Sequence, residues 1–281
     1  MVSLAERRTM VAYLVDDYGV SERRGCRVIG LPRSTHRSLP DQARHTAVTS
    51  TIYRLSYRYP RFGYRKIHTL TVNEGHCVSR ETTRLIRKRE GLQVRKKQRK
   101  KRFLGQSTTD LRQAQYPNHV WSYDFVFDQS SDGRTLKHLT VVDEFTHEGL
   151  MIYVDRSLTS LDVIHCLAYL FELYGVPECI KSDNGPEFVA KRVQQWLKER
   201  HVKVRYIDPG SPWQNGHNES FNGVFRDGCL NRWSFYSVAE ARRVIDQWLE
   251  EYNEVRPHGS INQMTPRAYA AMHRQRVAKA A

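Results

Sequence analysis

Three acidic residues occupy positions where a carboxylate could carry out chemistry. Asp124 lies in the middle of an apolar, strand-like segment, S-Y-D-F-V, where a charge is costly unless it is paired or bound to a cation. Asp183 ends a later strand-like segment. Glu219 falls on an expected helix beyond the next strand, with 35 residues between Asp183 and Glu219. Ligand sites of α/β sheets gather at the carboxyl ends of strands, so these acids form one candidate site.

The types of these residues favour a metal site. If the strands that carry Asp124 and Asp183 are neighbours, the two carboxylates come within roughly 5 Å, one strand spacing. Carboxylates at that distance repel one another unless cations lie between them, and hard oxygen ligands select Mg²⁺ or Mn²⁺. With Glu219 as a third ligand, two metal ions about 4 Å apart have the geometry for in-line phosphoryl transfer.

Several short sequence motifs accompany these acids along the chain. They are S-D-N-G-P-E-F around Asp183, S-P-W-Q-N-G-H-N-E-S-F-N-G around Glu219, F-G-Y-R-K-I from Phe62, Y-N-E-V-R-P-H from Tyr252, and Thr265-Pro266. The acids and the motifs that accompany them in the core resemble the D,D-35-E signature of retroviral integrases and of insertion-sequence transposases made from two overlapping reading frames. Upstream, F-G-Y-R-K-I resembles the start of that family's second helix-turn-helix unit. The chain lacks the His-His-Cys-Cys zinc spacing of retroviral integrases and any sustained heptad. It therefore resembles the second-frame (orfB) product alone.

The resemblance implies a DDE transposase. Asp124, Asp183 and Glu219 would be catalytic and would bind Mg²⁺, with Mn²⁺ as a substitute. The enzyme would cut the ends of an insertion sequence and transfer the freed 3′ strand to a second site. The implied partners are double-stranded DNA of the terminal repeats and of the target, further copies of the chain as a homo-multimer on paired ends, and the first-frame product. A bacterial, cytoplasmic, nucleoid-associated protein is expected.

The same family places a basic residue seven positions after the glutamate, which here is Arg226. Seven residues are about two helical turns, so Arg226 shares a helix face with Glu219, and Asn222 lies between them. We expect Arg226 and Asn222 to contact DNA near the cut.

The elements that must position these residues can be located from hydrophobic patterns. We expect strands at 119–127, 136–142, 149–154, 178–182 and 202–207, and helices at 160–174, 186–201, 217–229 and 238–252. Three antiparallel strands followed by helix, strand, helix, strand and helix is the order of the ribonuclease H-like α/β fold. The expected core is thus a mixed five-stranded sheet with flanking helices, as in integrases, preceded by an all-α arm with helix-turn-helix units.

The net charge of +15 is concentrated in the first third of the chain. Residues 1–105 hold 25 lysines and arginines and 8 acids, a net charge of +17, whereas the remaining 20 basic and 22 acidic residues give −2. The asymmetry favours a polyanion-binding arm on a separate module, although a solvated surface is the alternative. We expect a helical, helix-turn-helix-like region at 1–58, a second such unit with a basic linker at 59–105, the catalytic core at 106–275 and a tail at 276–281.

Within the arm, glycines and serines mark helix ends. Helices are expected at 4–18 and 22–29, with another starting at 33, and at 64–74 and 80–90. On the last of these, Thr83, Ile86 and Arg87 share one side. The basic run that follows is expected to lie along DNA rather than to be a flexible linker. The candidate DNA-binding residues of the arm are Arg80, Arg84, Arg87, Lys88, Lys96, Lys97, Lys100 and Lys101.

Two other functions fit parts of the pattern. A ribonuclease H-like nuclease without strand transfer would need no end-recognition arm, and a DNA-binding regulator with an inactive core would not need all three acids. The five cysteines form no C-x-x-C pair, which indicates reduced, buried thiols. No apolar run has transmembrane length, and we expect no membrane association.

Overall fold

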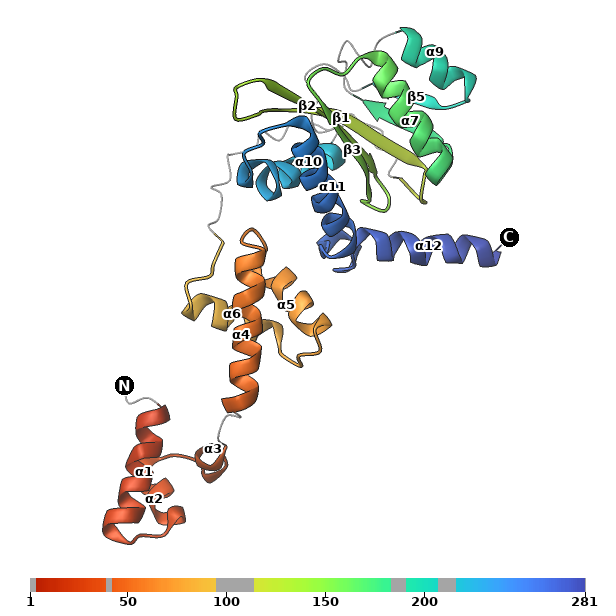
Figure 1. Cartoon of the computed structure of the whole chain (residues 1–281). Coiled ribbons are helices and arrows are strands. Elements are labelled where there is room, and N and C mark those ends of the chain that lie inside the picture. Colours follow the sequence, from red (N-terminus) through yellow and green to blue (C-terminus); the bar gives the residue numbers. More distant parts are fainter. Residues whose placement is uncertain (1–3, 39–41, 95–113, 183–190, 207–215, 281) are drawn as a thin grey trace, which may run out of the picture.

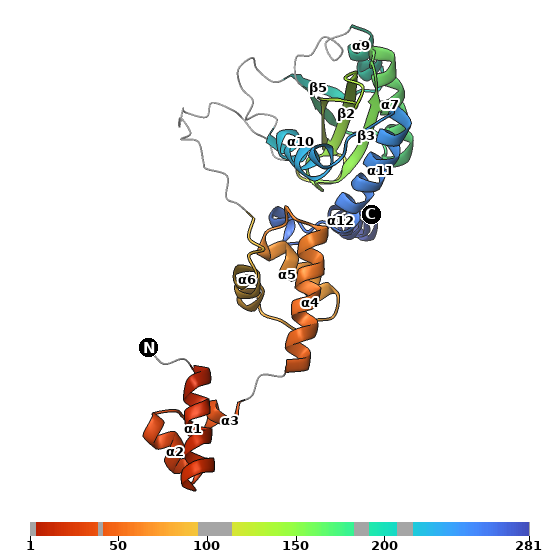
Figure 2. The same cartoon turned by 60° about the vertical axis from the view of Figure 1, so that its left-hand side comes forward.

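The computed structural model describes residues 4–38, 42–94, 114–182, 191–206 and 216–280. Along the chain, two groups of helices precede a sheet that is covered by helices on both faces (Figure 1). In two views, the second helical group lies between the first group and the sheet (Figures 1 and 2). None of the described helices combines the length and the apolar composition that a bilayer crossing needs.

The first helical group consists of α1 (Leu4–Tyr18), α2 (Glu22–Ile29) and α3 (Arg33–Arg37). Ser21 caps α2 by accepting a hydrogen bond from the backbone N–H of Arg24, and Gly30 ends it at a φ of 67°, which glycine adopts without strain. A small core of Val11, Cys26 and Leu31 holds α1 and α2 together. The expected ends of α1 and α2 are confirmed.

The second helical group consists of α4 (Gln42–Arg58), α5 (Tyr64–Asn73) and α6 (Arg80–Arg89). Ile52, Ile67 and Ile86, one from each helix, meet in a shared core. The boundary expected after residue 58 therefore does not separate two modules, because α4 packs on α5 and α6. The sequence pattern did not predict α4 as an element. Its buried side is narrow, and its other positions are largely polar.

The sheet contains β1 (Val120–Gln129), β2 (Thr135–Asp143), β3 (Gly149–Asp155), β4 (Cys179–Ser182) and β5 (Lys203–Tyr206). Its strand order is β3-β2-β1-β4-β5. The first three strands pair antiparallel, while β4 runs parallel to both β1 and β5. This is the mixed five-stranded sheet predicted from the sequence, and each described strand lies within two residues of its expected bounds. The ribonuclease H-like core is confirmed.

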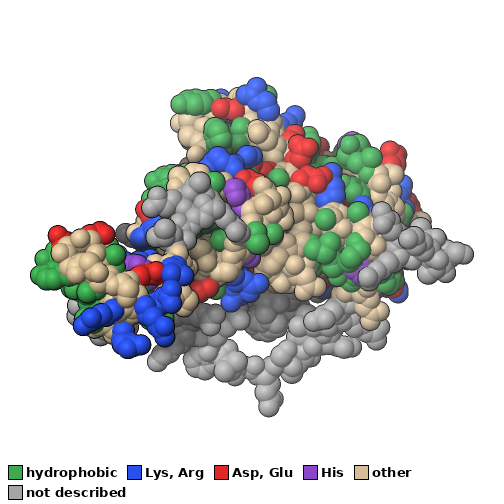
Figure 3. Space-filling model, turned by 90° about the horizontal axis from the view of Figure 1, so that it is seen from below, with side chains coloured by type: hydrophobic (Ala, Val, Ile, Leu, Met, Phe, Trp, Pro, Cys, Tyr) green, Lys and Arg blue, Asp and Glu red, His purple; other side chains and the backbone are tan. Residues whose placement is uncertain are grey.

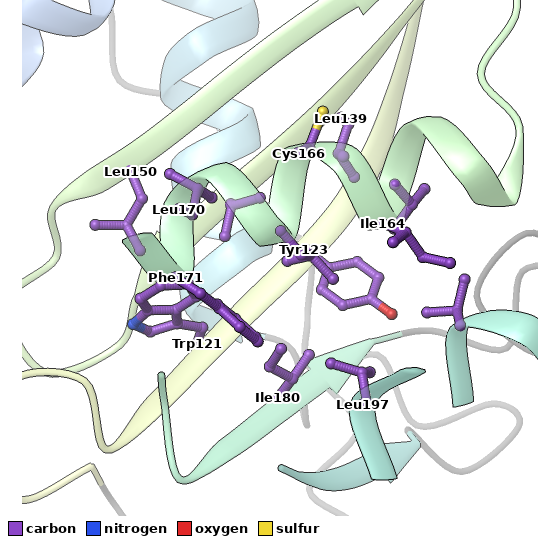
Figure 4. Close-up of a cluster of buried hydrophobic side chains, with 14 of the residues drawn as sticks. Trp121, Tyr123, Leu139, Leu150, Ile164, Cys166, Leu170, Phe171, Ile180 and Leu197 are labelled. Carbon is purple, nitrogen blue, oxygen red and sulfur yellow. The ribbon is translucent and has the colours of Figure 1, made fainter. Parts of the chain in front are cut away.

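One face of the sheet is covered by α7 (Ser160–Tyr174) and α9 (Lys191–Glu199). Trp121 and Tyr123 of β1 point into this cluster, where they meet Leu170, Phe171 and other apolar side chains of α7 (Figure 4). Thr159 begins α7 with a capping box that includes Asp162. The helix expected at 186–201 is described only from residue 191 onward.

The other face of the sheet is covered by α10 (Gly216–Gly228) and α11 (Val238–Glu254). Phe221 and Phe225 of α10 pack with Ile245 of α11 against β1, β2 and β3. The approach is close at Gly149, where an added Cβ would lie 2.6 Å from Leu249 Cδ1 and 2.8 Å from a ring carbon of Phe221. The absence of a side chain at Gly149 is therefore required for both helices to lie on this face.

The chain ends in α12 (Pro266–Ala280), which starts at the Thr265-Pro266 motif. Thr265 Oγ1 accepts a hydrogen bond from Ala268 N, and Pro266 is the first helical residue, a position that suits proline. This helix crosses the boundary at which the tail at 276–281 was expected to begin. Of the five cysteines, four are buried as predicted, but Cys77 is exposed.

Candidate active site and nucleic-acid interface

Asp124 faces the helices α10 and α11. Side chains alternate along a strand, and Trp121 and Tyr123 point to the opposite face, into the α7 cluster. Asp124 therefore shares a face with Val126, which packs in the cluster beneath α10 and α11. Its side chain is half-buried. A half-buried carboxylate within a strand is the arrangement that the sequence predicted for this residue.

The Asp124 carboxylate is oriented by two hydrogen bonds. Its Oδ1 accepts from the backbone N–H of Phe125 at 2.7 Å, and its Oδ2 accepts from Asn222 Nδ2 at 2.8 Å. Asn222 lies on α10, the helix that also carries Glu219. A hydrogen bond to an ionised carboxylate is among the stronger ones in proteins, so it fixes the helix relative to the strand.

Thr140 of β2 completes this contact. It is the register partner of Asp124, and its Oγ1 lies 3.2 Å from the Asp124 carbonyl oxygen, 3.0 Å from Asn222 Oδ1 and 3.3 Å from Asn218 Oδ1. Asn218 and Asn222 are four residues apart, one helical turn, so both amides reach the same hydroxyl. Thr140 and Asn218 were not predicted as site residues. The available signal was a threonine within an expected strand and a pair of asparagines at helical spacing.

Asn222, which was expected to contact DNA, makes two hydrogen-bond contacts with protein groups. Both ends of its amide are engaged, one with Asp124 and the other with Thr140. Asn222 therefore acts on the orientation of the carboxylate. Its position three residues after Glu219 is as expected, but its partners are protein groups.

Glu219 is exposed in the first turn of α10. With about 100° per residue, its side chain points roughly 60° around the helix from that of Asn222. It also lines a cavity of about 280 Å³ between α10, α11 and the turn that joins α4 to α5. The structure thus brings Asp124 next to the helix of Glu219, while the Glu219 carboxylate remains open to a ligand.

Asp183 lies outside the described residues. The strand before it is described, and its register pairs Ser122 of β1 with Lys181 of β4. Asp124 and Asp183 each follow these partners by two residues in the sequence. The expectation that the strands of the two aspartates are neighbours is confirmed by the parallel pairing of β1 and β4.

Arg226 is exposed on the same side of α10 as Glu219, which agrees with the expected seven-residue spacing. Its Nη2 donates a hydrogen bond to the carbonyl oxygen of Phe127, three residues beyond Asp124 on β1, at 3.1 Å. One guanidinium group offers five N–H donors, so this bond holds the side chain beside the site and still leaves donors for a phosphate.

The basic residues expected to bind DNA through α6 fall into two sets. Arg80 and Lys88 are exposed, and Arg84 is ion-paired with Glu81, with an Nε–Oε2 distance of 2.8 Å. Arg87 does not belong with them. It is 3% exposed and donates to the carbonyl oxygens of Phe62 at 2.8 Å and Leu92 at 2.6 Å.

The assignment of Arg87 to the DNA-binding set is thus corrected. Its guanidinium is buried inside the α4–α6 group, where it donates hydrogen bonds to backbone carbonyl oxygens and not to solvent or DNA. Lys and Arg side chains also gather over the N-terminal helices, on the left of Figure 3. The remaining candidates of the arm lie outside the described residues; they are Lys96, Lys97, Lys100 and Lys101.

Other buried acids of the core have structural partners. Asp143 accepts hydrogen bonds from three backbone N–H groups, those of Asn118, Phe145 and Thr146, while burial raises its pKa. Glu144 pairs with Lys181 at 2.8 Å. These residues hold the turn after β2 in place and are separate from the site at Asp124.

Comparisons with known proteins agree with this geometry. Two family models, both described as integrase core domain, match residues 114–212 and 200–266. The chain is 40% identical over 257 residues to the insertion element IS407 uncharacterized 31.7 kDa protein of Burkholderia multivorans, covering 91% of this chain and 92% of that protein. It is 37% identical over 269 residues to the insertion element IS476 uncharacterized 39.2 kDa protein of Xanthomonas euvesicatoria, covering 95% and 78%.

A solved structure shares the fold. The simian T-cell lymphotropic virus intasome, in complex with PP2A regulatory subunit B56 gamma, matches 78% of this chain and 74% of its own chain, with a TM-score of 0.51 and 17% sequence identity. The extent of the insertion-element matches and the integrase core models confirm the family predicted from the sequence. The chain belongs to the insertion-sequence transposases with an integrase-like core, which are polynucleotidyl transferases that act in DNA transposition.

Proposed function

We propose that this transposase cleaves the ends of its insertion sequence and transfers the freed strand to target DNA in a Mg²⁺-dependent reaction, with Asp124, Asp183 and Glu219 as the catalytic residues. The observation that carries the proposal is the hydrogen bond from Asn222 to Asp124. It fastens the helix of Glu219 to the strand of Asp124, at the end of the sheet where β4 leads into Asp183.

The residues present suit a hard divalent cation. Asp124 offers a half-buried carboxylate whose orientation is fixed by two hydrogen bonds, and Glu219 offers an exposed one on the adjoining helix. Oxygen ligands of this type select Mg²⁺, with Mn²⁺ as a substitute. When bound there, the metal would supply Lewis acidity to the reacting phosphate. Asn222 and Thr140 would keep the Asp124 oxygens in place throughout.

The reaction consists of two displacements at phosphorus. In the first, a water oxygen forms a bond to the scissile phosphorus, and the bond to the 3′ oxygen breaks, which leaves a 3′-hydroxyl on the element. In the second, this hydroxyl attacks a phosphodiester of the target and displaces another 3′ oxygen. The number of phosphoester bonds is unchanged in the second step, so no ATP is required. Arg226, which is held at Phe127 on the strand of Asp124, would bind a phosphate oxygen of the strand being cut.

The arm would supply recognition of the ends. Its charge of +17 over residues 1–105 favours phosphate binding, and α6 offers Arg80 and Lys88 on its exposed side. Paired ends would be held by a homo-multimer, and the first-frame product remains a proposed partner.

A joining assay tests the proposal. The protein is incubated with labelled end DNA, unlabelled target DNA and Mg²⁺, and the products are separated by size. We expect cut ends and joined products, neither of which should form with EDTA. A nuclease without strand transfer would cut without joining, and a regulator with an inactive core would bind without cutting.

A further inference from the structure

Two of the sequence motifs contain none of the proposed catalytic residues, and they contact one another in the structure. The motif that begins at Phe62 lies in the second helical group, and the motif that begins at Tyr252 lies at the end of α11 in the core. Arg256 of the second motif places its guanidinium carbon 4.9 Å from the centre of the Phe62 ring. Val255 packs against the apolar cluster that α4, α5 and α6 share.

The core side of this contact is rigidly held. The side chain of Asn253 donates to the carbonyl oxygen of Gly149 and accepts from its N–H, both at 2.9 Å, which ties α11 to β3. Tyr252 is 5% exposed and packs among Phe221 and Trp248. The centre of its ring also lies 6.0 Å from the guanidinium carbon of Arg256. Arg256 is therefore presented by a fixed part of the core.

The arm side of the contact leads directly to α6. The Phe62 ring stacks on Tyr59 with centroids 4.7 Å apart, and the Phe62 carbonyl oxygen accepts the hydrogen bond from Arg87 of α6. Arg87 of α6 and Arg256 of the core thus both contact Phe62. Phe62 therefore links the core to α6 through two contacts.

A second, polar contact lies beside the first. Glu251 Oε1 accepts from Arg58 Nη2 at 2.6 Å and from the Tyr59 hydroxyl at 3.0 Å. Arg58 is the last residue of α4, so this contact and the Phe62–Arg256 contact hold both ends of the α4–α5 turn. Lys66 of α5 is packed there too, and burial, with a smaller effect of Arg256, lowers its pKa to about 7.

We propose that Phe62, Arg256, Arg58 and Glu251 form a docking joint that holds the DNA-binding helices at a fixed distance from the catalytic core. The joint determines where the cut falls relative to the recognised end sequence. The residues of the joint are positioning residues, because they act through the placement of α6 and touch no reacting atom. This inference rests on the proposed function only for its consequence at the DNA; the docking itself does not depend on it.

Charge reversal of the exposed ion pair tests the joint in the full-length protein. Arg58→Glu and Glu251→Arg each place like charges together, whereas the double variant restores an opposite pair. The matched control is Glu250→Arg, which makes the same change at an exposed position next to Glu251. Two properties are measured: hydrogen exchange of the Tyr59 and Phe62 amides, and the position of the cut on labelled end DNA at nucleotide resolution.

We expect each single reversal to speed exchange of these two amides by about tenfold, the equivalent of about 1.4 kcal/mol, with the sheet amides unchanged. Cuts by the single variants should spread over neighbouring phosphodiesters. The double variant should restore both slow exchange and a single cut position.

Three results would overturn the proposal. They are unchanged exchange in both single variants, a spread of cuts that the double variant does not reverse, and the same effects from Glu250→Arg. If the wild-type protein neither cuts nor joins, the proposed function fails, but the exchange measurement still decides whether the arm docks through these residues.

Discussion

Replacement of Asn222 by alanine removes one of the two described hydrogen bonds that orient the Asp124 carboxylate, the one that comes from another element. The fold should tolerate the change, because Asn222 is only half-buried and Thr140 keeps its contacts with Asn218 and the Asp124 carbonyl. The catalytic rate should fall, because an Asp124 carboxylate that can rotate about its side-chain bonds no longer holds its oxygens in one orientation. We therefore expect a loss in rate that exceeds the loss in stability.

The size of the loss follows from the bond. A hydrogen bond from an amide to a charged group contributes about 1.5–3 kcal/mol. If that energy is available only while Asp124 holds its catalytic orientation, the joining rate falls roughly 10- to 150-fold. The concentration of Mg²⁺ that gives half-maximal joining should rise as well, because a less ordered ligand binds the cation more weakly.

The measurement is joining by Asn222→Ala over a Mg²⁺ titration, with the melting temperature of each protein. Asn218→Ala is the matched control, since it removes an amide from the same hydroxyl of Thr140 but makes no described contact with Asp124. It should lower stability and leave the rate per folded molecule nearly unchanged. Equal rates for Asn222→Ala and the wild type, or equal losses in the two variants, would refute this role of Asn222.

Three further predictions concern Arg226, the arm and Lys66. Arg226→Ala should weaken end-DNA binding and joining without unfolding the core; a melting temperature lower by many degrees with catalysis intact would make Arg226 structural. Alanine at the four linker lysines (Lys96, Lys97, Lys100 and Lys101) should weaken binding to all DNA and flatten the log–log dependence of the binding constant on salt, whose wild-type slope should be about −5. Arg80→Ala should instead reduce the preference for end DNA over random DNA. A wild-type slope near zero would contradict both predictions. The pKa of Lys66 falls from 10.5 to about 7 on folding, so the unfolded chain binds the extra proton between these values, and stability against urea should rise from pH 7 to pH 9. Lys66→Met should lose that rise, and a wild-type midpoint that falls over this interval would contradict it.

The catalytic core was largely predictable because its patterns are strong. Alternation of apolar residues located each strand, and the Asp124 environment was evident from a single charge in an apolar segment. The condition that the first and fourth strands are neighbours is met in the structure, where β1 pairs with β4. Local signals of this kind determine which face of the sheet a residue occupies.

The arm was less predictable. What the sequence did not indicate there is which groups a side chain contacts, whereas the helical periodicity was informative. Arg87 lies at a helical position that faces inward, yet its charge suggested DNA. Nothing local indicates that the carbonyl oxygens of Phe62 and Leu92 will receive it. Likewise, α4 is stabilised by packing on α5 and α6, which a pattern along one helix does not reveal.

The central claim is that Asp124, Asp183 and Glu219 act together on phosphorus, and strand joining by single variants tests it most directly. Asp124→Asn, Asp183→Asn and Glu219→Gln change one charge each and nearly preserve shape. Each should reduce cleavage and joining to the level seen with EDTA, while affinity for end DNA and the melting temperature remain close to those of the wild type. Near-normal joining by any one of the three variants would remove that residue from the active site and contradict the account.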